Sequence, residues 1–275
     1  ARPGQLIHVD IDPDEIGRNY PVALGLMADL RTFLRQVLAE LETRKGVADV
    51  AASRKKWLAT IDGMRQEWNR FIAPGFVDES TPIHPQRAAH EIDKALPDDA
   101  IMVSDIGVHH NWLLQFCKPK RPDSFIGTMG FGAMGFGVAG VLGAKLAAPD
   151  KDVIAVTGDG FYMFGTPVHA LWAARHYKAP FMVVVYQNRS YSTGTLRINS
   201  VYGKDSYTSK ADYDGGYFDP PIDFAKEAEA AGAYGENVTD SAQVEGALRR
   251  GLKAIREEGR PAVISVWLAR LLQKD

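Results

Sequence analysis

The chain has 275 residues, which is enough for one large domain or two modest ones. Hydrophobic residues make up 45% of it and charged residues 24%, as in globular proteins, which excludes disordered and fibrous classes. The 32 basic and 34 acidic residues give a net charge of −2, without the basic surplus typical of a nucleic-acid-binding protein. No apolar run approaches the roughly 18 residues of a membrane-spanning helix, and the single cysteine, Cys117, excludes an internal disulfide. We therefore expect a cytoplasmic protein without nucleic-acid or membrane partners. Because the chain opens on Ala1 and not on Met, we expect a processed or partial chain.

The first 45 residues are predicted to contain one strand and two helices. Leu6–Asp12 has the composition of a strand, and Pro13 begins a short helix. After Pro21, apolar residues recur at helical spacing as far as Leu41. One strand and two helices cannot bury a core of their own, so we expect residues 1–45 to be the C-terminal part of a middle, Rossmann-like α/β domain.

Residues 46–79 are predicted to be a linker followed by a helix. The segment 43–53 is small and polar, as linkers are. The helix after it carries large apolar side chains at spacings of three and four, which favours packing against the next domain over contact with a cofactor. These side chains are Trp57, Ile61, Met64, Trp68 and Phe71.

From about residue 80, strands and helices alternate. Pro85 begins a helix that runs through Leu96, and a strand follows at Ala100–Val103. Three later strands are continuous apolar runs, as expected where both faces of a sheet are buried: Asp152–Thr157, Phe181–Tyr186 and Pro261–Trp267. The alternation predicts an α/β domain over residues 80–275, with a mainly parallel sheet and helices on both faces. Between Ser192 and Pro221 no period is evident, and we expect a long loop.

Glycine is concentrated between Gly127 and Gly143, where seven of 17 residues are glycine. The run matches the pattern G-x-G-x-x-G twice, beginning at Gly130 and at Gly135. By itself it fits equally well a dinucleotide-binding turn, as in an NAD(P)-dependent oxidoreductase, and a glycine-lined helix packed closely on a sheet.

Two of the predicted strands end in polar side chains. Gly158-Asp159-Gly160 follows one of them, and Gln187-Asn188 ends the next, with one crossover helix between. Because parallel strands joined by one crossover end on the same edge of the sheet, Asp159 and Asn188 are predicted to face one crevice. Their oxygens, together with a backbone carbonyl from Ser190 and phosphate oxygens, are the hard ligands that suit Mg²⁺. The alternative is two ordinary strand ends with capping residues.

A third strand end, Ser104–His110, is predicted to lie on the same edge. Its adjacent histidines, His109 and His110, point to opposite sides, so we do not expect them to ligate one metal together. We expect at least one of them to be structural, and one to be able to reach a substrate or a phosphate.

Gly158-Asp159-Gly160 followed by Gln187-Asn188 resembles the signature of thiamine-diphosphate-dependent enzymes, G-D-G and then N-N. The chain has Gln187 in place of the first Asn, and the two halves of its signature lie slightly further apart than is usual in the family. The resemblance extends from residue 5 to about 267, and the nearest group is the acetolactate-synthase-like enzymes. It also rests on segments that look like the family's middle domain, His8–Pro13, and its cofactor domain, Pro82–Pro85, Ser104–Gly107 and Gly132–Gly137.

The resemblance implies roles for individual residues. Asp159, Asn188 and the Ser190 carbonyl would bind Mg²⁺. Met134 would bend the cofactor into a V, and it is a candidate catalytic residue together with His109 and His110. The residues implied to contact the cofactor are Gly107, Val108, His109, Gly132, Met134, Asp159, Gly160, Phe161 and Asn188.

The activity implied by the resemblance is cleavage or formation of a C–C bond next to a carbonyl, with thiamine diphosphate as the electron sink. A 2-oxo acid decarboxylase, a carboligase and a lyase all fit. The segment Arg189–Gly194 departs from that of true acetolactate synthases, so that particular activity is not implied. FAD, which the middle domain binds in some members, cannot be judged from one strand.

In this family an activating Glu comes from the N-terminal domain of a neighbouring subunit, and no segment here resembles that domain. We therefore expect the chain to be inactive alone, to require an N-terminal half, and to pair as a homodimer or homotetramer. Two other functions remain open: an NAD(P)-dependent oxidoreductase, and a non-catalytic partner domain that keeps the fold.

Overall fold

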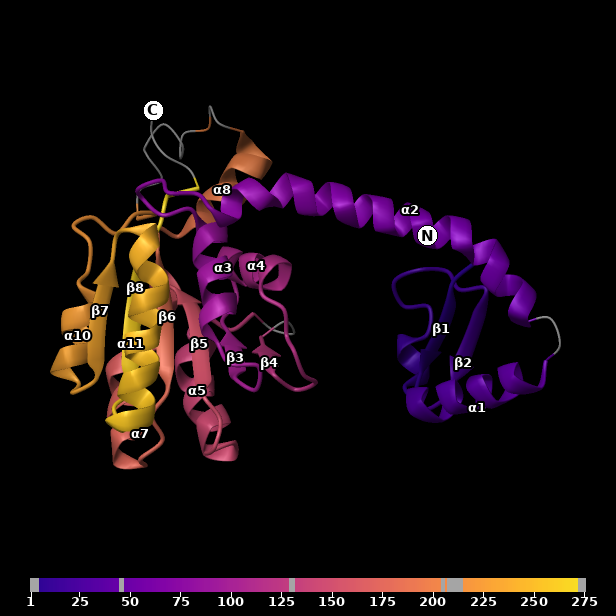
Figure 1. Ribbon diagram of the computed structural model, residues 1–275, viewed down its shortest axis with the longest axis horizontal. Coiled ribbons are helices and arrows are strands. Elements are labelled where there is room, and N and C mark those ends of the chain that lie inside the picture. The colour runs from indigo at the N-terminus through magenta and orange to yellow at the C-terminus, as the bar shows by residue number, and fades with distance from the viewer. Residues whose placement is uncertain (1–4, 45–46, 129–131, 204–205, 207–214, 272–275) are drawn as a thin grey trace. The chain divides into compact units, whose positions relative to one another are not determined.

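The computed structural model describes residues 5–44, 47–128, 132–203, 206 and 215–271, with no description of the side chains of residues 47–53. The chain divides into two compact units, residues 1–71 and 72–275 (Figure 1). Across the described residues, no helix combines the length and the apolarity that crossing a membrane requires.

The first unit contains a two-stranded parallel sheet. Its strands are β1 (Ile7–Asp10) and β2 (Leu24–Met27), with Ile7 paired to Leu24 and Asp10 to Met27. The expectation of a single strand is therefore wrong. The four residues of β2 lie just before a strong helical pattern, which masked them. The helical elements are η1 (Pro13–Glu15), α1 (Leu30–Thr43) and α2 (Val47–Ile72).

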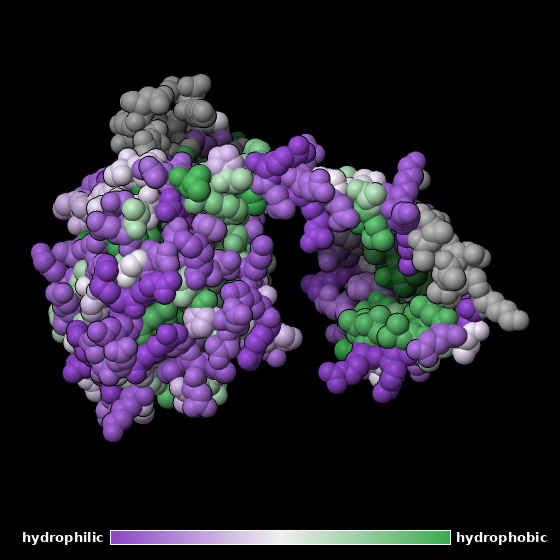
Figure 2. Space-filling model, in the orientation of Figure 1, coloured by the Kyte–Doolittle hydropathy of each residue, from purple (hydrophilic) through white to green (hydrophobic). Residues whose placement is uncertain are grey.

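The expectation of a linker over residues 43–53 is also wrong, because α2 already begins at Val47. Its first turns are rich in alanine, the best helix former, which a criterion of small and polar residues does not recognise. The predicted apolar stripe on α2 is largely exposed, with Trp57 at 59% and Phe71 at 77% of full exposure. None of the described side chains between residues 5 and 71 is buried, and apolar side chains gather on the surface of α1 (Figure 2).

The second unit is built on a six-stranded sheet in the order β4-β3-β5-β6-β8-β7, in which every pair is parallel (Figure 1). The predicted mainly parallel sheet is thereby confirmed. Two strands were missed because they are edge strands, one only three residues long and the other largely polar. The strands are β3 (Ile101–Ser104), β4 (Phe125–Gly127), β5 (Val153–Gly158), β6 (Met182–Gln187), β7 (Tyr234–Val238) and β8 (Ala262–Trp267).

Helices cover both faces of this sheet and bury a separate apolar cluster on each face. One cluster includes side chains of α3 (Pro85–Ala95), α4 (Val108–Phe116) and α11 (Val244–Glu257). The other includes side chains of α5 (Phe136–Ala147), α6 (Asp159–Phe164), α7 (Pro167–His176) and α10 (Phe224–Ala230). The 3-10 helices η2 (Ala73–Phe76) and η3 (Ser241–Gln243) precede α3 and α11.

The segment expected to be a long loop begins instead with a helix, α8 (Ser192–Tyr202). The apolar periodicity did not predict this helix, because its Ser, Thr and Gly residues give it little amphipathic pattern. Part of the remaining segment, residues 204–205 and 207–214, lies outside the described residues. The helix begins shortly after β6 ends, next to the predicted metal ligand Asn188.

Candidate functional site

A cavity of about 590 Å³ lies at the carboxyl ends of the central strands. Residues that follow β3, β5, β6 and β8 line it, among them Gly107, Asp159, Asn188 and Leu268. The first residues of α8 close one side of the cavity. The parallel topology thus brings four strand ends to one cavity, where open α/β sheets bind their ligands.

Asp159 joins the ends of β5 and β6. One of its carboxylate oxygens accepts a hydrogen bond from the backbone N–H of Gly160 at 2.8 Å, and the other accepts from the backbone N–H of Arg189. The side chain is only 3% exposed, and burial raises the pKa of Asp159 to about 7. A divalent cation beside this carboxylate would favour its charged form and lower that pKa again.

Asn188 is held by its neighbours. Its Oδ1 accepts from the backbone N–H of Ser190 at 3.0 Å, and its Nδ2 donates to Ser192 Oγ at 3.1 Å. Arg189, which follows Asn188, has a left-handed backbone with φ of 58°, and its N–H bonds to Asp159. The guanidinium of Arg270 donates to the carbonyls of Asn188 and Arg189 at 3.3 and 3.4 Å, so it fastens this turn to the end of β8.

The structure separates the two histidines. His109 lines the cavity and is 5% exposed, and its Nε2 has no hydrogen-bond partner among the described residues. Burial lowers the pKa of His109 to about 3, so its ring is neutral at physiological pH. His110 does not line the cavity, and its Nδ1 lies 2.8 Å from Ser104 Oγ. Successive helical side chains diverge by about 100°, which is why the candidate catalytic residue His110 is not brought to this cavity.

The glycines at the cavity are explained by close packing of aromatic rings. Gly107 has φ of 125°, and a Cβ there would lie 2.8 Å from the ring of Phe161. A Cβ on Gly160 would lie 2.5 Å from the ring of Tyr191. Phe161, Tyr191 and Val108 also line the cavity, so these glycines let aromatic walls close around it.

The glycine-rich run contributes Gly132 and Met134 to the cavity lining. Its second G-x-G-x-x-G begins at Gly135, which caps the N-terminus of α5 with φ of 80°. There a Cβ would lie 2.5 Å from the backbone of Gly165, so glycine permits the close contact between α5 and the turn after α6. The first match begins at Gly130, which lies outside the described residues.

Tyr186 and Ser192 are among the cavity residues that the sequence did not identify as site residues. Tyr186, in β6, was treated as an apolar strand residue, yet its hydroxyl is buried without a partner among the described residues and the side chain lines the cavity. Ser192 was assigned to a loop, although it begins α8 and contacts Asn188. The signal available in the sequence was their proximity to Asn188.

The cavity offers an anion no cationic side chain, because none of the described residues that line it is Lys or Arg. Nor do three His, Cys, Asp or Glu side chains come together as a metal site anywhere in the described residues. One buried carboxylate with amide and carbonyl oxygens suits Mg²⁺ when a diphosphate supplies further oxygens. The donor set therefore fits a metal and a diphosphate that bind together.

The fold and this donor set define an α/β domain suited to a metal–diphosphate ligand. The family model described as thiamine pyrophosphate enzyme, C-terminal TPP binding domain, matches residues 105–266, and the chain belongs to this family. The predicted resemblance is confirmed, and the alternative of an NAD(P)-binding domain finds no support.

Individual relatives agree with the family model. A probable acetolactate synthase large subunit from Methanocaldococcus jannaschii is 29% identical over 259 residues, which cover 92% of this chain and 41% of the relative. A putative thiamine pyrophosphate-containing protein, YdaP, from Bacillus subtilis is 29% identical, with 95% of this chain and 42% of the relative covered. The chain thus spans about two fifths of the length of these relatives.

Among solved structures, a thiamine diphosphate-dependent 4-hydroxybenzoylformate decarboxylase from Rhodococcus jostii is similar to the chain. Its TM-score is 0.61 at 26% sequence identity, with 70% of this chain and 34% of that chain covered.

Proposed function

We propose that this protein is a thiamine-diphosphate- and Mg²⁺-dependent lyase or transferase that cleaves or forms a C–C bond next to a carbonyl. Its substrate is a 2-oxo acid or a related carbonyl compound. The observation that carries this function is the hydrogen bond from Arg189 N–H to the Asp159 carboxylate, which brings the polar ends of β5 and β6 together.

Three groups of this chain hold the metal in this proposal: the Asp159 carboxylate, Asn188 Oδ1 and the Ser190 carbonyl. The hydrogen bonds of Asp159 and Asn188 to neighbouring backbone N–H groups keep both side chains beside the same turn. Among these three groups Asp159 is the only anion, so diphosphate oxygens would complete the coordination.

The remaining cavity residues hold the organic part of the cofactor. Backbone N–H groups at the start of α4, at Val108 and His109, would hold the diphosphate, because the helix dipole favours negative charge there. The Nε2 of the neutral His109 ring, which has no partner among the described residues, donates or accepts a hydrogen bond according to its tautomer. Gly160, Phe161 and Gly132, which line the cavity, would contact the cofactor, and Met134 would support a bent shape of it. Thiamine diphosphate, when bound, supplies an electron sink for the reacting carbon.

The proposal includes a further domain that carries the activating Glu, since the relatives are more than twice as long as the segment they share with this chain. The site would then be completed by an N-terminal half, in a homodimer or homotetramer.

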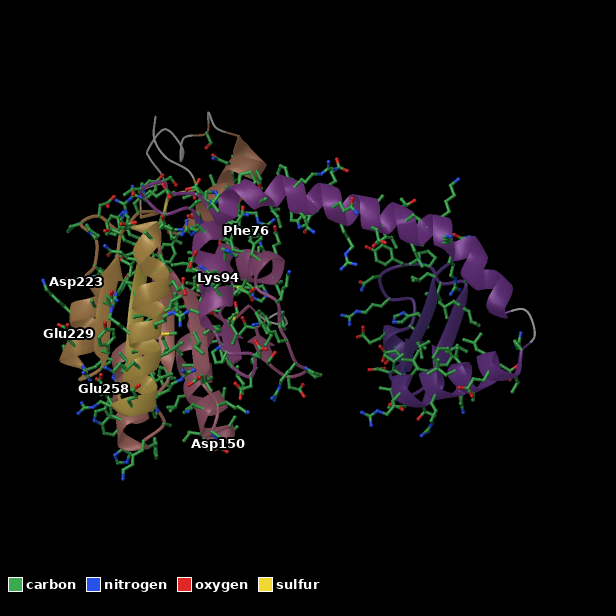
Figure 3. The ribbon with its side chains drawn as sticks, viewed as in Figure 1. Phe76, Lys94, Asp150, Asp223, Glu229 and Glu258 are labelled. Carbon is green, nitrogen blue, oxygen red and sulfur yellow. The ribbon has the colours of Figure 1, made fainter. Side chains whose placement is uncertain are left out.

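The metal assignment is tested by Asp159→Ala. We expect the variant to lose Mg²⁺-dependent binding of thiamine diphosphate in calorimetry, because it removes the only anion among the three proposed ligands. Asp150→Ala is the matched control. Asp150 is exposed and lies just beyond α5, at the opposite end of the sheet from the cavity (Figure 3). Undiminished Mg²⁺-dependent binding by Asp159→Ala would contradict the assignment.

A further inference from the structure

The carboxamide of Asn188 is fixed by two contacts made on opposite sides. The backbone N–H of Ser190 donates to Oδ1 at 3.0 Å, and Nδ2 donates to Ser192 Oγ at 3.1 Å. Ser192 is only 5% exposed, so water does not readily replace its hydroxyl. Within the part of the chain that the structure describes, Ser192 is thus the acceptor given for the NH₂ group.

These contacts decide which way the amide faces. A backbone N–H can only donate, so the amide atom that faces Ser190 N must be the oxygen. The NH₂ group then points to Ser192, whose hydroxyl is able to accept. An amide oxygen has two lone pairs, which leaves Oδ1 of Asn188 one lone pair for a cation.

The hydroxyl of Ser192 is itself held in place. Its Oγ lies 2.8 Å from Ser190 Oγ, so it can accept from Asn188 and donate to Ser190 at the same time. Ser192 is the first residue of α8, whose opening turn is closed by hydrogen bonds from Gly194 N and Thr195 N to the Tyr191 carbonyl. The hydroxyl that accepts from Asn188 therefore belongs to a residue whose backbone is fixed by α8.

We propose that Ser192 is a positioning residue for the metal site: its hydroxyl holds the NH₂ group of Asn188 away from the cation and thereby presents Oδ1 to it. This role rests on the proposed function, because it assumes that Asn188 binds Mg²⁺. Without Ser192 the NH₂ group would lose this acceptor, and the contact from Ser190 N–H would be left to hold Oδ1 toward the metal with less constraint.

The test compares Ser192→Ala with Thr195→Val in the full 275-residue chain. Thr195 is also buried, and its hydroxyl bonds to the Ser192 carbonyl in the same helix without an assigned contact to Asn188. The measured quantity is the Mg²⁺ concentration that gives half-maximal binding of thiamine diphosphate, followed by quenching of tryptophan fluorescence, since Trp112 lines the cavity.

We expect Ser192→Ala to require about tenfold more Mg²⁺, the usual effect of removing a partner of a metal ligand. The Mg²⁺ requirement of Thr195→Val should stay within about twofold of the wild type, even if this variant lowers the melting temperature as much as Ser192→Ala does. The reason is that the Thr195 hydroxyl bonds within the helix. Ser192→Thr keeps the hydroxyl and should restore the wild-type Mg²⁺ requirement, which separates the hydrogen bond from a loss of packing.

The positioning role of Ser192 and the binding of Mg²⁺ and thiamine diphosphate by this chain can fail separately. If the wild type shows no Mg²⁺-dependent binding of thiamine diphosphate, the proposal that this chain holds the metal and the diphosphate fails. If the wild type binds but Ser192→Ala has the same Mg²⁺ requirement, the positioning role is wrong and the proposed function stands. A Ser192→Thr variant as weak as Ser192→Ala would also overturn the role of the hydroxyl.

Discussion

At the scale of single residues, burial at the cavity makes protonation of His109 unfavourable. The folded protein keeps its ring neutral, with a pKa of about 3, whereas an unfolded chain binds a proton below about 6.5. The unfolded state therefore holds more protons between these two values. Stability from this residue is fully present above pH 6.5 and is lost as the pH falls toward 3.

The corresponding prediction is that His109→Gln flattens the acid limb of the stability curve. The neutral amide does not titrate, so the free energy of unfolding should fall less steeply than in the wild type, by about 1.4 kcal/mol per pH unit at most. Urea unfolding of both proteins at pH 7 and pH 5 measures the difference. Parallel curves for the two proteins would show that His109 is not held neutral by burial.

The residue pattern was sufficient to predict that Asp159 and Asn188 line one cavity, because parallel strands joined by one crossover end on the same edge of the sheet. It was not sufficient for contacts made by side chains across the sheet edge. Gln187, which stands where the family has Asn, donates to the Ile222 carbonyl at 2.7 Å and accepts from Ser265 Oγ at 2.7 Å. Neither partner is near Gln187 in the sequence, so no local pattern could reveal these two hydrogen bonds.

At the scale of elements, the pattern of apolar residues identified the central strands of the sheet but not its edge strands. Strands β5, β6 and β8 are buried on both faces and have continuous apolar sequences. Strand β7 is at an edge, and its sequence YGENV has polar residues at its centre because fewer of its side chains are buried. The sequence of helix α8 has little amphipathic pattern, so the sequence by itself does not distinguish this helix from a loop.

A prediction at this scale compares two glycines, Gly135, which caps the N-terminus of α5, and Gly143, which lies within the helix. Gly135→Ala must place a methyl group 2.5 Å from backbone atoms of Gly165 and adopt a left-handed conformation, so we expect it to lower the free energy of unfolding by about 2 to 4 kcal/mol. Gly143 is exposed within the helix, and nothing lies within 4 Å of its Cβ position. Gly143→Ala should raise the free energy of unfolding by about 0.5 to 1 kcal/mol.

Chemical denaturation of the wild type and the two variants measures these opposite changes. If Gly135→Ala proves as stable as Gly143→Ala, then α5 does not approach the turn at Gly165 as closely as described. The comparison thereby checks the packing interpretation of the second G-x-G-x-x-G directly.

At the scale of the whole molecule, the two units differ in what they bury. The apolar clusters belong to the second unit, between Ile72 and Leu268, whereas the described side chains of residues 5–71 are all exposed or half-buried. On α1, Leu30 and Leu38 are 55% and 63% exposed. Since a two-stranded sheet is at best marginally stable in water, β1 and β2 need a cover that their own unit does not supply among these residues.

We therefore predict strongly unequal hydrogen exchange within the isolated 275-residue chain. Amides of β5 and β6, buried on both faces, should exchange only through global unfolding, whereas those of β1 and β2 should exchange with little protection because local opening costs little there. Mass spectrometry of peptides from both regions measures the ratio, and a dilution series supplies the control. Protection of β1 that disappears on dilution would identify association between copies as its cover. Protection of β1 equal to that of β5 at every concentration would mean that the first unit is stabilised within the single chain, contrary to the exposure of its apolar side chains.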